Sequence, residues 1–160
     1  MAEQIVINTS PLIALSRIDV LEVIRKLPFE FVCPSAVREE LDTGVLHGYP
    51  ALVTSWIQVL PLSSVENPIA RVTLDRGEAA VIQLALERKI KRVCIDDWKG
   101  RRVALAVGLE ITGTLGLLTK AKLLGLIPAV RPCIEQLNRH GAWYDEKLIQ
   151  RVLMGIGENW

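Results

Sequence analysis

Residues 5–13 constrain the fold of this 160-residue chain more than any other stretch. The stretch begins with three β-branched apolar residues, which predict a short buried strand. Ser10 and Pro11 follow as the expected N-cap and first residue of a helix, where a missing N–H has no consequence. Asn8 would then lie at the carboxyl end of a strand and beside a helix N-terminus. Ligands bind at such places in open α/β sheets, so we expect a functional site there.

The alternation of strand and helix patterns continues along the chain. Further strands are expected at residues 29–33, 56–60, 93–95 and 109–111. Helices are expected at residues 11–27, 34–41, 77–88, 98–107, 115–124, 133–139 and 145–154. This order predicts an α/β fold, with a parallel sheet covered by helices on both sides and joined by right-handed crossovers.

Length and composition narrow the class of protein. Half of the residues are apolar, which predicts one folded domain over residues 1–160, with a helical extension from about residue 129. The net charge of +1 argues against a strongly basic, nonspecific nucleic-acid binder. Three isolated cysteines in apolar surroundings predict reduced core residues and a cytoplasmic protein. We expect neither a signal peptide nor a segment that crosses a membrane.

Four acidic residues share the setting of Asn8, each near the end of a predicted strand or in a predicted helix. They are Glu40, Glu78, Asp96 and Asp97. The junctions that follow parallel strands lie along one edge of the sheet, where clustered carboxylates repel one another unless a cation is bound. Magnesium suits such a place because it takes oxygen ligands and keeps several waters. A bound Mg²⁺ or Mn²⁺ would polarise a phosphate and lower the pKa of an attacking water.

Each of these residues also has an ordinary structural interpretation. Glu78 lies three residues after Asp75, the spacing of a capping box. Glu40 fits a solvated helix residue, and Asp97 with its neighbour fits a cap of the helix at residues 98–107. Asn8 fits a polar turn residue. Arg101 and its neighbour Arg102 fit either a solvated position or a contact to phosphate.

Five segments together are similar to one known family. They contain Val6 to Leu15, Pro34 with Val37, Glu40 and Leu41, Asp75 to Ala79, Ile95 to Asp97 with Gly100 and Arg101, and Thr112 to Gly116. In this order and over residues 5–128, the chain resembles the PIN-domain superfamily, and within it the DUF3368 group of VapC-like toxin ribonucleases. Each segment alone would be a weak indication, but the set is specific.

The resemblance implies a three-layer α/β/α sandwich around a central parallel sheet. It also implies a Mg²⁺- or Mn²⁺-dependent ribonuclease that acts on RNA, often as the toxin paired with an antitoxin protein, and commonly as a homodimer. The family's quartet of acids falls on Asn8, Glu40, Glu78 and either Asp96 or Asp97. Thr9 or Ser10 would support the first of these positions by hydrogen bonding, and Arg101 is a further supporting residue of the site.

The amide at Asn8 departs from the family, which has an acid at this position. An amide oxygen can bind a hard cation but brings no charge. Two hypotheses therefore remain: a metal-dependent endoribonuclease, or a weakened or inactive PIN-fold protein that acts in RNA binding or protein interaction. A third hypothesis, a small-ligand α/β domain, is disfavoured because no glycine-rich phosphate loop follows the first strand.

Overall fold

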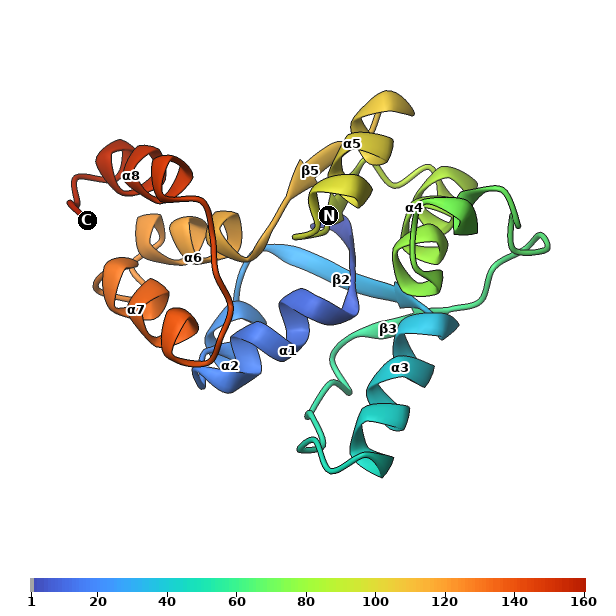
Figure 1. Cartoon of the computed structure of the whole chain (residues 1–160), viewed down its shortest axis with the longest axis horizontal. Helices are drawn as coiled ribbons and strands as arrows, with labels where there is room; N and C mark the ends of the chain where they lie inside the picture. The colour runs from blue at the N-terminus through green and yellow to red at the C-terminus, as the bar shows by residue number, and fades with distance from the viewer. Residues whose placement is uncertain (1) are drawn as a thin grey trace.

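The computed structural model describes residues 2–160 and is built on five parallel strands in the order β3-β2-β1-β4-β5 (Figure 1). The strands are β1 (Glu3–Ile7), β2 (Phe29–Pro34), β3 (Gln58–Leu60), β4 (Arg92–Cys94) and β5 (Glu110–Thr112). The central strand β1 pairs with β2 and β4, so that Val6 lies between Val32 and Val93. The predicted α/β class with a parallel sheet is confirmed.

Within residues 2–160, eight α-helices and one 3₁₀ turn connect and cover these strands. They are α1 (Thr9–Arg17), α2 (Leu21–Ile24), α3 (Ser35–Leu46), η1 (Ala70–Val72), α4 (Arg76–Arg88), α5 (Trp98–Ala106), α6 (Thr114–Leu123), α7 (Arg131–Arg139) and α8 (Glu146–Gly155). Figure 1 shows α1 and α2 on one side of the sheet and α4 and α5 on the other. Helix α4 contacts three strands as well as α3 and α5, whereas α1, α2 and α6 pack on one another.

The beginning and end of α1 differ from the prediction. The N-cap is Asn8 rather than Ser10, so Pro11 is the third helical residue. Proline fits there because the first N–H groups of a helix have no intrahelical acceptor. The predicted continuous helix to residue 27 is wrong, because Asp19 adopts a left-handed conformation with φ of 57° and separates α1 from α2. Aspartate enters this region more easily than most residues.

The ends of other helices and strands differ from their predicted positions by fewer residues. Helix α3 continues past the expected end at residue 41 and includes Gly44 in its last turn. Strand β3 is shorter than expected, and η1 lies between β3 and α4, where no helix was predicted. The predicted helices at residues 133–139 and 145–154 are confirmed as α7 and α8, which begin two residues and one residue away from the expected positions.

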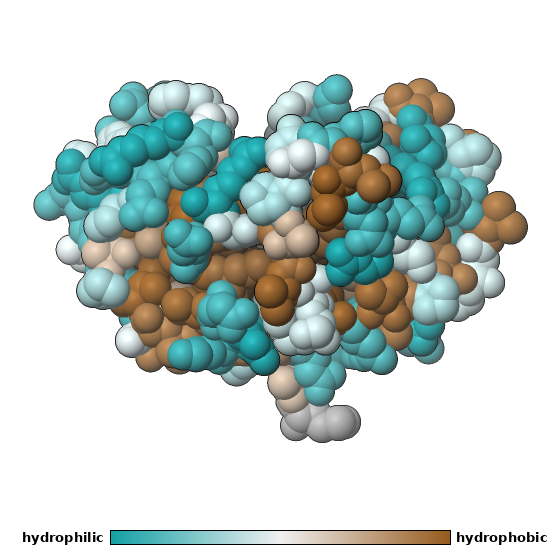
Figure 2. All heavy atoms as spheres, turned by 90° about the horizontal axis from the view of Figure 1, so that it is seen from below, coloured by the Kyte–Doolittle hydropathy of each residue, from teal (hydrophilic) through white to brown (hydrophobic). Residues whose placement is uncertain are grey.

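One hydrophobic core joins the sheet to both C-terminal helices. Ile134 and Leu137 of α7 and Ile149 and Leu153 of α8 are buried in the same cluster as Ile7. On the face seen in Figure 2, apolar side chains form a band among polar ones, and the outline is notched between two lobes. Between residues 2 and 160, no helix has the length and apolar character needed to cross a membrane.

The C-cap of α4 offers a test of local backbone strain. Lys89 holds φ of 56°, a left-handed conformation that costs about 1 kcal/mol for a residue with a Cβ. Lys89→Gly is expected to raise the free energy of unfolding by up to about 1 kcal/mol, since glycine's greater freedom in the unfolded chain offsets part of the gain. Urea denaturation measures the change. Arg88→Gly, inside the helix, is the control and should be destabilising; a loss of stability in both variants would contradict the strain at Lys89.

Candidate active site

The candidate residues come together because strands end and helices begin at one edge of the sheet. Asn8 joins β1 to α1, and Asp96 and Asp97 join β4 to α5. Glu78 lies in the first turn of α4, and Glu40 lies on α3. Three of these helices direct N-termini toward this region, and their partial positive charge reduces the repulsion among the carboxylates.

Asn8 and Glu40 approach each other at the start of α4. The hydroxyl of Thr9 donates a hydrogen bond of 2.7 Å to Oε2 of Glu40, which leaves Oε1 free of that bond. Gly77 makes the approach possible. A Cβ at Gly77 would overlap Oε1 of Glu40 and would lie 3.1 Å from Oδ1 of Asn8. The carboxylate and the amide oxygen therefore converge on the space beside Gly77, which any larger side chain would enter.

The amide oxygen of Asn8 is buried and has no hydrogen-bond partner within residues 2–160. An asparagine at an N-cap normally accepts a hydrogen bond from the second or third helical N–H. Asn8 makes no such bond, although its backbone has the extended conformation of an N-cap. A buried acceptor without a donor costs roughly 1–3 kcal/mol. The amide oxygen of Asn8 is therefore free to bind a ligand, because no donor group of the described residues occupies it.

Glu78 is the most enclosed carboxylate of the group, with 6% of its surface exposed. Its backbone N–H donates a 2.8 Å hydrogen bond to Oδ1 of Asp75, which confirms Asp75 as the cap of α4. Burial raises the pKa of the Glu78 carboxyl to about 7, and the charges of Asp75, Asp97 and Glu40 add to this rise, while the backbone N–H of Asp75 opposes it. The side chain of Glu78 thus shares one electrostatic environment with two of the other candidate acids.

Asp96 and Asp97 have different partners although they are neighbours in sequence. Oδ1 of Asp96 accepts from the backbone N–H of Thr114 at 2.8 Å, and Oδ2 accepts from the Thr114 hydroxyl at 2.6 Å. Asp97 is exposed and caps α5, accepting from the N–H of Lys99 at 2.8 Å. The capping role considered for Asp97 is confirmed, and Asp96 is bound to the start of α6.

Two further candidates lie around Asp96. Arg101 donates from Nη1 to the carbonyl oxygen of Ile95 at 3.1 Å. A Cβ at Gly113 would lie 2.7 Å from both Nη1 of Arg101 and Oδ1 of Asp96, so the guanidinium and the carboxylate flank the same glycine. Ser10 is exposed and lines a pocket of about 440 Å³ together with Asp96 and Asp97.

Comparison with known proteins gives the family of the chain. The model of the DUF3368 family, described as a PIN domain, matches residues 4–158. The chain belongs to this family of PIN domains. The resemblance inferred from the sequence is thereby confirmed, and the fold is of the nuclease type. No curated protein matches the chain.

PIN domains generally use divalent metal ions, and the donors of this PIN domain can be tested against that requirement. Within residues 2–160, no group of three or more His, Cys, Asp or Glu side chains is arranged to hold one metal ion. Asn8 and Glu40 lie together against Gly77, and the charge of Glu40 acts on Glu78; one of these three oxygen donors is an amide. Mg²⁺ keeps several waters and needs only one or two carboxylates directly. The residues of this PIN domain fit a largely hydrated cation better than a cage of protein ligands.

Sequence interpretation did not assign a role to three residues around this site. Thr114 holds both oxygens of Asp96, and Gly77 provides the space beside Glu40. Tyr144 is half-buried, and burial, followed by the charge of Asp96, raises the pKa of its hydroxyl well above the ordinary value. Thr114 and Gly77 belong to the Thr-Gly-Thr and Asp-Arg-Gly-Glu junctions, which were visible in the sequence, but the contacts of all three residues depend on the tertiary fold.

Proposed function

We propose that this PIN domain is a Mg²⁺- or Mn²⁺-dependent endoribonuclease. In this proposal Glu40 and Glu78 are the carboxylate ligands and Asn8 is an amide ligand. Asp96 and Asp97 complete the acidic side of the site. The observation that carries the proposal is the buried amide oxygen of Asn8, which has no partner among the described residues and lies with Glu40 against Gly77.

The chain's own residues would then divide the work at the site. A divalent cation, when bound there, would supply charge to polarise a phosphate and to lower the pKa of a water. Thr9 orients Glu40 through its 2.7 Å hydrogen bond to Oε2, which leaves Oε1 beside Gly77. Thr114 fixes Asp96, and Arg101 lies where a guanidinium could contact a phosphate. The glycine at residue 77 keeps the approach free.

The proposal extends to the substrate, the partners and the compartment of this PIN domain. Single-stranded or structured RNA is the proposed substrate, and the cytoplasm the proposed compartment. We also propose an antitoxin protein and a homodimer. Exposed apolar side chains support a protein-binding surface, among them Leu86 and Leu105, which are 48% and 57% exposed. Residues 1–160 are proposed to act as one PIN-like domain with α7 and α8 as its extension.

One observation favours a second function, that of a PIN-fold protein with weak or no catalysis that binds RNA or protein. Asn8 brings no charge to the site, and both oxygens of Asp96 already accept hydrogen bonds from Thr114. Fewer free carboxylates mean a weaker hold on a divalent cation. The two functions therefore differ in whether cleavage depends on the remaining acids.

Glu40→Gln tests the enzyme directly. The wild-type protein is expected to cleave an end-labelled single-stranded RNA in millimolar Mn²⁺, and Glu40→Gln is expected to be slower by at least about tenfold, because loss of groups around a metal costs roughly 10–100-fold. Gel electrophoresis of the labelled RNA measures the rates.

Glu22→Gln is the control for this experiment, since Glu22 pairs with Arg25 on the surface. It should cleave like the wild type. Equal rates in all three proteins, or rates that EDTA leaves unchanged, would contradict the proposed metal-dependent nuclease, and an absence of cleavage would support the binding function.

A further inference from the structure

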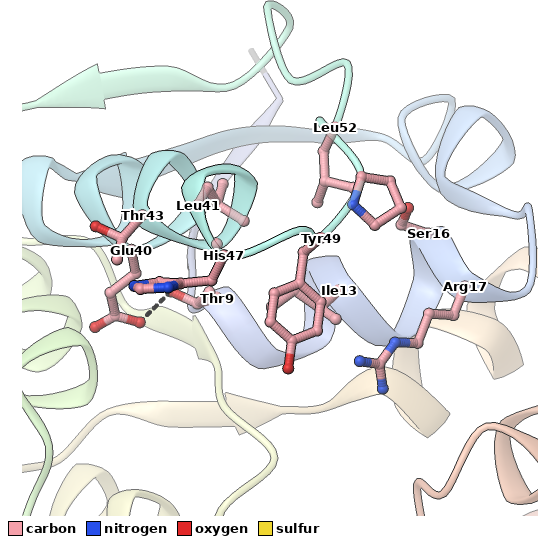
Figure 3. Close-up of a pocket in the computed structure, with 12 residues that line it drawn as sticks. Thr9, Ile13, Ser16, Arg17, Glu40, Leu41, Thr43, His47, Tyr49 and Leu52 are labelled. Carbon is pink, nitrogen blue, oxygen red and sulfur yellow. Dashed lines mark hydrogen bonds between the residues drawn. The ribbon is translucent and has the colours of Figure 1, made fainter.

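A pocket of about 380 Å³ adjoins the candidate active site between α1 and the end of α3 (Figure 3). It begins at Glu40 and Thr9, the hydrogen-bonded pair of the site. Its walls include the apolar side chains of Ile13, Leu41 and Leu52. A concave, mostly apolar space with a few polar groups is typical of a site for a small flat ligand. No residue of this pocket other than Glu40 and Thr9 has a role in the proposed catalysis.

The backbone at the end of α3 fixes Tyr49 at this pocket. Gly48 has φ of 93°, and its N–H donates to the carbonyl of Val45 at 3.1 Å. The N–H of Tyr49 donates to the carbonyl of Gly44 at 2.9 Å. These two bonds form a Schellman motif, which ends the helix in a defined geometry. Tyr49 packs against the last turn of α3, where a Cβ at Gly44 would lie in ordinary contact, 3.7 Å from Cδ2 of the ring.

The ring of Tyr49 is held in place and yet remains available to a ligand. It is 54% exposed. Figure 3 shows it between His47 on one side and Arg17 on the other. The guanidinium of Arg17 lies 5.9 Å from the ring centroid, within the range of a cation–π contact. An aromatic ring beside an arginine is a combination on which nucleic-acid bases stack.

We propose that this pocket holds the base of the nucleotide next to the cleaved phosphate of single-stranded RNA, with the base stacked on Tyr49. This inference rests on the proposed function, because it takes Glu40 as part of the site where the phosphate lies. A phosphodiester of RNA links two nucleotides, so a phosphate near Glu40 has a base on either side of it. The pocket begins at the same residue. Arg17 supplies the positive charge that the RNA backbone requires. The neighbouring carboxylate of Glu40 argues against a second phosphate inside the pocket.

Equilibrium binding tests the pocket separately from catalysis. A fluorescently labelled single-stranded RNA is titrated with the full chain in EDTA, and anisotropy gives Kd. Tyr49→Ala is expected to weaken binding roughly tenfold, within the range of stacking contributions measured by alanine substitution. Tyr49→Phe keeps the ring and should bind like the wild type. Val65→Ala is a control for loss of an exposed apolar side chain, since Val65 is 91% exposed and does not line this pocket.

A series of RNAs, each with one abasic position, identifies the base itself. In the wild type, the abasic position that corresponds to the pocket should weaken binding about tenfold, and the same RNA should lose nothing further in Tyr49→Ala. Equal Kd values for wild type and Tyr49→Ala, or no sensitive abasic position, would overturn the proposal. So would unchanged RNA binding with a change in sedimentation mass, which would assign the pocket to contact between copies. If RNA binding depends on Tyr49 but no Mn²⁺-dependent cleavage occurs, the base pocket stands and the nuclease proposal fails.

Discussion

Glutamine in place of Glu78 is expected to stabilise the metal-free protein at pH 8 by up to about 3 kcal/mol, since each pKa unit corresponds to about 1.4 kcal/mol. Burial raises the pKa of the Glu78 carboxyl to about 7 from an ordinary value of 4.5. The unfolded chain therefore releases this proton at lower pH than the folded protein. As pH rises from about 4.5 to about 7, the unfolded state gains stability from this ionisation and the folded protein loses relative stability. Glutamine has no proton to release, so this loss disappears.

Urea denaturation in EDTA at pH 5 and at pH 8 measures the effect. The stability difference between Glu78→Gln and wild type should be small at pH 5 and should increase at pH 8. Glu87→Gln is a control of opposite sign, because hydrogen bonds from Ser64 and Ser63 lower the pKa of Glu87 to about 2. Its stability at pH 8 should fall below that of the wild type. A difference for Glu78→Gln that does not change between the two pH values would contradict the raised pKa.

The same substitution should also reduce function. Glu78 is a proposed ligand, so Glu78→Gln is expected to lose Mn²⁺-dependent cleavage while gaining stability without metal. Gain of stability with loss of activity is characteristic of a site whose charges are held together against their repulsion. Substitution of a glutamate with only a structural role would not raise stability and abolish cleavage together.

Asn8→Asp is expected to tighten Mn²⁺ binding by about ten- to a hundredfold, because affinity for a hard cation rises with the number of charged ligands. The amide oxygen of Asn8 already lies with Glu40 at the space beside Gly77, so a carboxylate there needs little rearrangement. Cleavage of single-stranded RNA in Mn²⁺ should rise in the same variant. Without metal, the added negative charge near Glu40 should lower the melting temperature.

Melting temperatures with and without millimolar Mn²⁺ measure the binding, since a ligand that binds only the folded state raises the Tm. Asn138→Asp is the matched control, because Asn138 also has a buried side-chain oxygen without a partner in the part of the chain described, but lies on α7. Its Tm should not respond to Mn²⁺ more than that of the wild type. An equal Mn²⁺ response in wild type and Asn8→Asp, with no gain in cleavage, would exclude Asn8 as a ligand position.

The arrangement of strands and helices could be predicted because apolar runs and their spacing determine it locally. Three apolar residues at the start of the chain were enough to place β1, and the junction after β4 was expected one residue later than it occurs. The division of the first helix was not predictable, since Asp19 adopts its left-handed conformation within a continuous helical pattern. Propensity permits that conformation at many positions, and the tertiary fold selects one.

The directions in which the side chains of the site point could not be predicted from the sequence either. Asp96 and Asp97 have the same chemistry and adjacent positions, yet one binds Thr114 on α6 and the other caps α5. Asn8 was expected to precede the helix cap and instead is the cap, with its amide oxygen turned away from the helix N–H groups.

The glycine at residue 77 has a consequence for how this protein tolerates change. A single methyl group there would occupy the volume into which the Glu40 carboxylate extends. Such a side chain would fill this space and displace the Glu40 carboxylate without a change to any charged residue. A substitution at Gly77 would therefore act on the site through the position of Glu40, while every acid of this PIN domain is retained.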